Sequence, residues 1–296
     1  MLQRIAAILG GGSPATGEIY IGDDAAVLSP SIASWLVSTD VAVAGVHLDL
    51  DLFTISDLGF KAVMSAASDI AAMGGSLRAI VVAVTAPPGT DLEELHRGIA
   101  DAASELHAAV VGGDLSTGPH LQVAVTVLGE APAGGALRRS GAQVGDTLMV
   151  TGALGRPAAG LRRRREGAEP ADALVRAQSR PRARMASGVA AAAAAVSAAM
   201  DISDGLAIDL NRLADASSVG FEVDEIPIAD GATRQEALSG GEDYELLIAT
   251  SDVEAFRSQC RHADLPEPIV IGRVVAAGTR TASGQPLPPV GWLHEF

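Results

Sequence analysis

Residues 55–73 read ISDLGFKAVMSAASDIAAM, and this stretch decides how the first half of the chain is organised. Its apolar residues recur every three to four positions, which predicts a helix. Lys61, Ser65 and Asp69 follow at intervals of four residues, so they form one narrow polar stripe on that helix. Two interpretations of the stripe stay open: a solvent-exposed helix face, or a face that turns Asp69 inward toward a metal ion.

Strand-like segments alternate with helical ones around this stretch. In the first half we expect strands at 35–43, 77–85 and 120–129, an extended segment from residue 110 into Gly112-Gly113-Asp114, and a second helix at 92–108. The run Ala131-Pro132-Ala133-Gly134-Gly135 is typical of a linker. We therefore expect two domains, residues 1–135 and 136–296.

The second half predicts a mixed domain. We expect helices at 154–165, 183–199 and 206–217, an irregular or partly helical segment at 167–182, and strands at 147–150, 221–228, 244–249 and 269–275. The predicted fold class is α+β.

Composition excludes several classes of protein. Of the 296 residues, 48% are hydrophobic and 19% charged, enough apolar content for a packed core. No apolar run approaches the roughly 20 residues of a membrane span. The N-terminus lacks a recognisable export signal, so we expect a cytoplasmic protein that does not use membranes. Cys260 is the sole cysteine, which excludes an internal disulfide and a thiolate zinc site.

The charge balance restricts the chemistry further. A formal net charge of −15 argues against a nucleic-acid binder. The quartet Arg162–Arg165 is either the solvated end of a helix or a small nucleic-acid patch. Lys61 is the only lysine, and the P-loop and protein-kinase motifs are absent. If the chain handles phosphates, divalent cations must supply most of the positive charge.

Short acidic motifs recur where strands end or helices begin. They are Gly22-Asp23-Asp24, Ser38-Thr39-Asp40, Ser68-Asp69, Gly113-Asp114 and Asp201-Ile202-Ser203-Asp204. Each alone is compatible with turn or cap chemistry, and Ser203 or Asp201 could simply cap the next helix. The same helix start would also accept a phosphate. Taken together, the motifs offer the oxygen ligands that Mg²⁺ prefers.

Two further sites have both a structural and a functional interpretation. The segment Gly240–Leu247 contains three carboxylates and a tyrosine after a glycine pair. It is either a turn entering a strand or a place where Glu242 faces a cationic part of a substrate. His47 is either an ordinary core or surface histidine or a ligand-binding one.

Read in order, these motifs resemble the thiamine-monophosphate kinase family, and the likeness spans nearly the whole chain. The superfamily also includes aminoimidazole ribonucleotide synthetase, selenophosphate synthetase and a hydrogenase-maturation protein. The motifs that carry the resemblance are 21–26, 38–40 with 45–47, 68–74, 112–114, 139–142, 201–206 and 238–246. One departure is Ala66, where the family usually has asparagine.

The resemblance implies direct in-line transfer of the ATP γ-phosphoryl group to thiamine monophosphate, which gives thiamine diphosphate. It implies several Mg²⁺ ions held by Asp24, Ser38, Thr39, Asp40, Asp69, Asp114 and Asp201, and a further one by Asp204. ATP would contact Gly113, Asp114, Arg139 and Ser203. The thiamine part would contact His47, Glu242 and Trp292. No general base is needed, because the accepting phosphate oxygen is already ionised.

The resemblance also implies an aminoimidazole ribonucleotide synthetase-like fold of two domains. The N-terminal domain would pair across a twofold axis in a homodimer and build a shared β-barrel, and the C-terminal domain would be a layered α/β unit. Competing interpretations are another superfamily member, a catalytically silent nucleotide- or metal-binding regulator, and a metal-stabilised structural protein. The cysteines that two of the sister families need are absent from their positions in this sequence.

Overall fold

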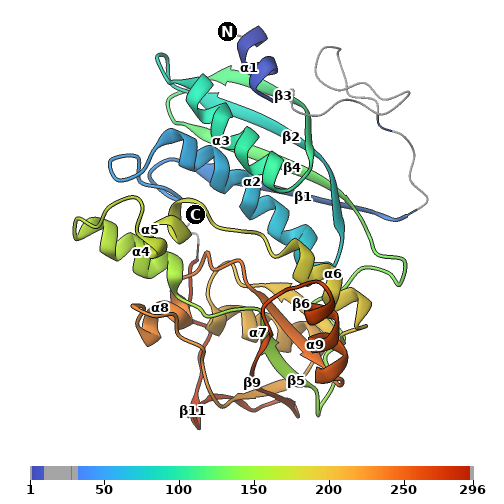
Figure 1. Cartoon of the computed structure of the whole chain (residues 1–296). Helices are drawn as coiled ribbons and strands as arrows, with labels where there is room; N and C mark the ends of the chain where they lie inside the picture. The colour runs from blue at the N-terminus through green and yellow to red at the C-terminus, as the bar shows by residue number, and fades with distance from the viewer. Residues whose placement is uncertain (1, 10–27, 29–32, 294–296) are drawn as a thin grey trace. The chain divides into compact units, whose positions relative to one another are not determined.

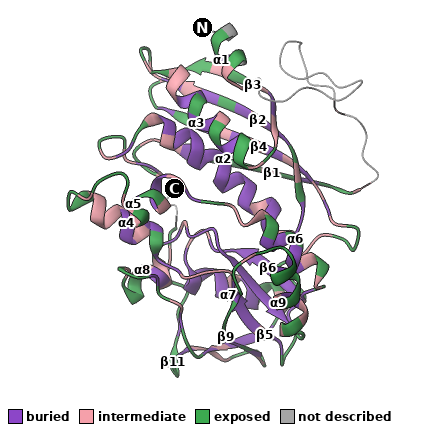
Figure 2. Cartoon of the chain, in the orientation of Figure 1, coloured by how far each residue is buried: buried purple, intermediate pink, exposed green. Residues whose placement is uncertain are grey.

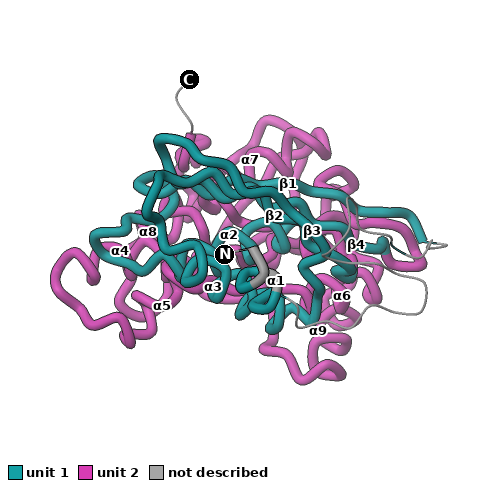
Figure 3. Tube along the Cα trace, turned by 90° about the horizontal axis from the view of Figure 1, so that it is seen from above, with its two compact units in different colours: residues 1–70, 76–131 teal, residues 71–75, 132–296 magenta. Residues whose placement is uncertain are grey.

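The computed structural model describes residues 2–9, 28 and 33–293 (Figure 1). The chain divides into two compact units, coloured separately in Figure 3. The first comprises residues 1–70 and 76–131, and the second comprises residues 71–75 and 132–296. Ala71 and Ala72, the last two residues of the helix that carries the polar stripe, therefore belong to the second unit.

The first unit is a four-stranded sheet with helices. The strands lie in the order β1 (Trp35–Val43), β4 (Gln122–Glu130), β2 (Ser76–Ala86) and β3 (Ala109–Thr117). Its helices are α1 (Leu2–Leu9), α2 (Ile55–Ala72) and α3 (Leu92–Glu105). β2 and β3 are parallel, a pairing that needs a crossover connection, and α3 provides it; the other two pairings are antiparallel.

Helix α2 is buried along nearly its whole length (Figure 2). α2 and α3 approach so closely that a Cβ on Gly98 would lie 1.8 Å from the carbonyl oxygen of Ser56. The buried face of the sheet carries Val123, Val125 and Val127, whereas Val37 and Val41 on the alternate positions of β1 are 65% and 42% exposed. Among the described residues this sheet is open, and it does not close into a barrel.

The second unit is built on a seven-stranded mixed sheet. Its strands lie in the order β11 (Gln285–Pro286), β10 (Arg280–Ala282), β7 (Gly220–Val223), β9 (Ile269–Val275), β5 (Thr147–Val150), β8 (Leu246–Thr250) and β6 (Ala198–Asp201). The helices are α4 (Arg156–Arg165), α5 (Ala173–Ser179), α6 (Met185–Ala193), α7 (Leu206–Ser217), α8 (Arg234–Ser239) and α9 (Val253–His262).

The predicted helix at 183–199 is wrong in its last six residues, 194–199. Helix α6 ends at Ala193, Ala195 adopts a left-handed φ of 51°, and residues 198–201 form strand β6 against β8. A run of alanines favours helix at every position and contains no local stop signal, so pairing with a strand far along the chain decides the outcome.

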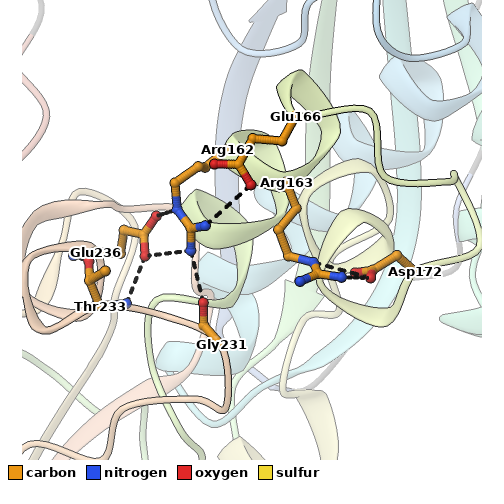
Figure 4. Close-up of polar contacts among 7 residues, drawn as sticks. All are labelled: Arg162, Arg163, Glu166, Asp172, Gly231, Thr233 and Glu236. Atoms are coloured by element: carbon orange, nitrogen blue, oxygen red, sulfur yellow. Dashed lines mark hydrogen bonds and ion pairs between the residues drawn. The ribbon is translucent and has the colours of Figure 1, made fainter.

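The arginine quartet lies in the last turn of α4, where positive charges interact favourably with the helix dipole. Arg162 donates to Glu236 at 2.8 Å and to the Gly231 carbonyl at 2.8 Å, and Arg163 pairs with Asp172 (Figure 4). Two of the four guanidinium groups thus tie α4 to its neighbours, which favours the structural interpretation of the quartet.

No helix in the described part of the chain combines the length and the apolar character that crossing a membrane requires.

Candidate active site

The polar stripe of α2 faces the protein interior. Lys61 is only 2% exposed, and its ammonium donates to the His47 carbonyl at 2.9 Å. Further along the stripe, Asp69 accepts a hydrogen bond from the Ser38 hydroxyl of β1. The solvent-face interpretation is therefore wrong, because the stripe connects α2 to β1 and to the loop that follows it.

His47 lies in that loop with a defined hydrogen-bonding role. Its Nδ1 accepts the backbone N–H of Val43 at 3.0 Å. A ring nitrogen that accepts a hydrogen bond carries no proton, so in the neutral imidazole the proton lies on Nε2. The half-buried ring is thereby oriented by the end of β1.

The carboxylates on the sheet are separated by its width. Asp40 pairs with Val125 of β4, Val125 with Val82 of β2, and Val82 with Gly113 of β3. Three strand spacings of about 4.8 Å place Asp40 roughly 14 Å from Gly113, the neighbour of Asp114. That span is too wide for one Mg²⁺ ion, whose ligand oxygens lie about 2.1 Å from it.

Local contacts hold these polar groups in place. Asp40 accepts the N–H of Val41 at 2.9 Å, and Asp114 accepts the Ser116 hydroxyl at 3.1 Å. The Thr39 hydroxyl lies 3.1 Å from that of Thr126. The register of β2 against β3 shifts between Ile80 and Val81, where Val111 of β3 is left unpaired two residues before Gly113, an irregularity of the kind that often re-aims a side chain.

Within residues 2–9, 28 and 33–293, no three His, Cys, Asp or Glu side chains come close enough to form an ion site. Asp24, one of the expected metal ligands, lies outside the described residues. The remaining expected ligands divide between the two units, with Ser38, Thr39, Asp40, Asp69 and Asp114 in the first, and Asp201 and Asp204 in the second. The oxygens of the first group are of the type that hard cations prefer.

In the second unit, three segments far apart in sequence meet at one turn. The Glu242 N–H donates to the Ser203 carbonyl at 2.6 Å, and the Tyr244 N–H donates to Ile202 at 2.9 Å. The Trp292 N–H donates to the Asp204 carbonyl at 2.9 Å. The structure thus brings together four of the expected site residues, Ser203, Asp204, Glu242 and Trp292.

Asp204 is engaged by an arginine that the sequence did not point to. Arg212 of α7 lies 2.5 Å from the Asp204 carboxylate and 2.7 Å from that of Asp209. Asp209 is fully buried and also accepts the Asp204 N–H at 3.1 Å, and burial raises its pKa. A carboxylate that shares its charge with a guanidinium fits a metal less well, so Asp204 is the weaker ligand candidate of this turn.

The acidic segment 242–245 gives each carboxyl group a different environment. Glu242 accepts from the side-chain amide of Gln178 at 3.0 Å. Asp243 caps α4 by accepting the Gly155 N–H at 2.8 Å, and burial raises the pKa of Asp243 to about 8. The buried Glu245 pairs with Arg184 and accepts the Thr151 hydroxyl at 2.6 Å.

Arg139 lies apart from this turn. Its backbone carbonyl accepts the Ser217 hydroxyl at 2.9 Å, at the C-terminal end of α7, whereas Ser203 and Asp204 precede the N-terminal end. At 1.5 Å per residue the helix separates its two ends by roughly 18 Å. Arg139 is exposed.

Several residues of this arrangement have no signal in the sequence. Arg184 and Glu245 are 61 positions apart, and Gln178 and Glu242 are 64 apart, so nothing local relates them. Asp209 and Arg212 were detectable in principle, because their spacing of three residues on a helix that follows an Asp-rich turn favours contact.

Comparison with known proteins gives matches along most of the chain. Residues 22–131 match the AIR synthase related protein, N-terminal domain, and residues 143–283 match the corresponding C-terminal domain. Thiamine-monophosphate kinase of Mycobacterium tuberculosis is 37% identical over 250 residues, covering 79% of this chain and 75% of the relative. The Bacillus subtilis enzyme is 33% identical over 270 residues, covering 84% and 83%.

Comparison with solved structures also finds thiamine-monophosphate kinases. Thiamine-monophosphate kinase from Stenotrophomonas maltophilia gives a TM-score of 0.84 at 32% identity, covering 96% of each chain. AaThiL complexed with AMPPCP and TMP gives 0.80 at 28%, covering 99% of this chain and 96% of the other. Hydrogenase maturation protein HypE of E. coli gives 0.79 at 19% identity, covering 99% and 95%, which shows a shared fold alone.

The expected two-domain AIR synthase-like fold is therefore confirmed, and the fold alone does not separate the sister activities. Sequence identity does separate them. The chain belongs to the thiamine-monophosphate kinase family.

Proposed function

We propose that this protein transfers the γ-phosphoryl group of ATP to thiamine monophosphate and forms thiamine diphosphate and ADP. The observation that carries the proposal is the 37% identity to curated thiamine-monophosphate kinases over most of the chain. The AaThiL complex with AMPPCP, an ATP analogue, and TMP supports both substrates.

In the reaction, an oxygen of the thiamine monophosphate phosphate attacks the γ-phosphorus while the bond to the β-phosphate oxygen breaks. Both reactants are anionic, and the only lysine is buried against the His47 carbonyl. Mg²⁺, when bound, would neutralise the phosphates and align the attacking and leaving oxygens. The chain has no need of a general base, because the attacking oxygen is already ionised.

The residues proposed to hold Mg²⁺ are Asp24, Ser38, Thr39, Asp40, Asp69, Asp114, Asp201 and, less well placed, Asp204. Gly113, Asp114, Arg139 and Ser203 would contact ATP. The half-exposed indole of Trp292 and the carboxylate of Glu242 suit the cationic thiazolium ring, and His47 would also contact the thiamine part. Orientation of the two substrates by these groups is the protein's main contribution to the rate.

We further propose a homodimer. Val37 and Val41 leave an apolar strip on the open face of the first unit's sheet. Pairing of two such sheets about a twofold axis, which buries the strip and forms a shared barrel, would give this face a stable environment. Residues 1–135 would then supply dimerisation and most metal ligands, and residues 136–296 would supply groups for nucleotide and thiamine.

An acceptor panel tests the function against its sister activities. The protein is incubated with ATP and Mg²⁺ and with thiamine monophosphate, thiamine, selenide or no acceptor. We expect diphosphate formation with thiamine monophosphate alone. ATP binding without turnover on any acceptor would instead support a silent nucleotide-binding regulator.

A further inference from the structure

The turn that carries Glu242 is held in a costly backbone conformation. Glu242 and Tyr244 both adopt left-handed φ values, 60° and 49°. This backbone conformation is energetically unfavourable for residues other than glycine. Hydrogen bonds from their N–H groups to Ser203 and Ile202 fix the main chain. The backbone of Glu242 is therefore positioned in advance, and the direction of its carboxylate depends on side-chain contacts.

Gln178 supplies one such contact from another element. It is the next-to-last residue of α5, is 4% exposed, and its Nε2 lies 3.0 Å from Oε2 of Glu242. The amide nitrogen must be the donor, because an ionised carboxylate only accepts. Helix α5 is itself anchored, since its N-cap Asp172 pairs with Arg163 of α4.

The chemical type of this partner matters for the neighbouring charges. An arginine or lysine at position 178 would pair with Glu242 and cancel its charge, as Arg184 does for Glu245. A neutral amide orients the carboxylate and adds no charge. Glu242 is partly exposed, and Gln178 is one of its contacts. Asp243 and Glu245 are buried, with Asp243 accepting from Gly155 and Glu245 accepting from Arg184 and Thr151.

We propose that Gln178 is a positioning residue for acceptor recognition: its amide holds the Glu242 carboxylate so that it meets the cationic ring of thiamine monophosphate. The inference rests on the proposed function and adds to it a residue outside the expected site. Gln178 acts through Glu242 and touches no reacting atom, so its effect belongs to acceptor binding and not to phosphoryl transfer.

The test uses Gln178→Met, which keeps length and volume and removes the donor. The matched control is Gln259→Met on the exposed face of α9. Steady-state kinetics and isothermal titration with thiamine monophosphate are run on the full chain. One lost hydrogen bond to a charged group predicts a rise of roughly 10-fold in KM and Kd for thiamine monophosphate. We expect KM for ATP, kcat and the melting temperature to stay near wild type.

The outcomes separate the two claims. If wild-type protein forms thiamine diphosphate but Gln178→Met binds thiamine monophosphate within twofold of wild type, the positioning role is overturned and the function stands. Equal losses for ATP and thiamine monophosphate with a lower melting temperature also overturn it, because they indicate a structural role. Wild-type protein that does not bind thiamine monophosphate overturns both claims.

A second variant covers a loss of folding. Gln178→Asn keeps the amide on a side chain shorter by one methylene, so it should give an intermediate rise in KM for thiamine monophosphate. Wild-type affinity for thiamine monophosphate in a folded Gln178→Asn protein would contradict the proposal that the amide must reach the Glu242 carboxylate.

Discussion

At the scale of single residues, burial raises the pKa of Asp243 to about 8. In the unfolded chain it titrates near 3.8, so between those two values the folded protein binds a proton that the unfolded chain releases. Its contribution to stability is therefore present in full below pH 3.8 and is lost as the pH rises toward 8.

Asp243→Asn should remove this dependence, since an amide keeps the acceptor for the Gly155 N–H and cannot ionise. We expect the free energy of unfolding of the variant to gain on wild type by about 3–5 kcal/mol between pH 5 and pH 9. Urea unfolding at several pH values measures it. A difference between the two proteins that stays constant with pH would mean that Asp243 is ionised throughout.

Asp40 and Asp114 are the single residues that most directly test the proposed Mg²⁺ site. Asp40→Asn or Asp114→Asn keeps the side-chain shape and removes a charge, so kcat/KM should fall about 10³-fold or more with no change in circular dichroism. The exposed Asp230→Asn is the matched control and should behave as wild type. A loss of less than tenfold at Asp40 would count against its role as a metal ligand.

Among elements, α4 shows how arginines of one helix can differ in role, and Figure 4 shows the contacts of Arg162 and Arg163. Arg162 bridges α4 to Glu236, and Glu236 also completes the capping box of α8 with Thr233. Arg165 at the end of the helix is exposed. Arg162→Ala should lower the melting temperature by about 1–2 °C and Arg165→Ala by less. Equal shifts in differential scanning calorimetry would mean that the bridge contributes nothing measurable.

Elements also show what the sequence can reveal. The strands 35–43, 147–150 and 269–275 and the helix 206–217 have the predicted bounds, because their patterns are strong and their ends carry local signals. The polar stripe of α2 was ambiguous in the sequence, since a polar residue at every fourth position fits a solvent-exposed helix face and a buried polar face equally well. The burial of Lys61 and its hydrogen bond to the His47 carbonyl depend on tertiary packing, which the spacing of residues along one helix does not predict.

The candidate site likewise contains residues that the sequence motifs indicated and residues that only the structure reveals. Motif order pointed to Ser203, Asp204, Glu242 and Trp292, and backbone hydrogen bonds join them at one turn. Gln178, Arg184 and Arg212 were not anticipated, because each meets its partner through the fold or through a turn whose shape the sequence leaves open.

At the scale of the whole molecule, the net charge of −15 makes activity dependent on cations. The only lysine is buried, and among the residues proposed for the site only Arg139 carries a permanent positive charge. We expect excess EDTA to reduce turnover to background and added Mg²⁺ to restore it in full. Undiminished turnover in EDTA, measured by ADP release, would show that arginines alone suffice.

The central claim, transfer of a phosphoryl group to thiamine monophosphate, is tested most directly by ³¹P nuclear magnetic resonance of the wild-type protein with ATP, Mg²⁺ and thiamine monophosphate. The account predicts that the monophosphate signal is replaced by the two signals of thiamine diphosphate, with one ADP formed for each. Release of inorganic phosphate with an unchanged monophosphate signal, or no reaction while ATP is bound, would contradict it.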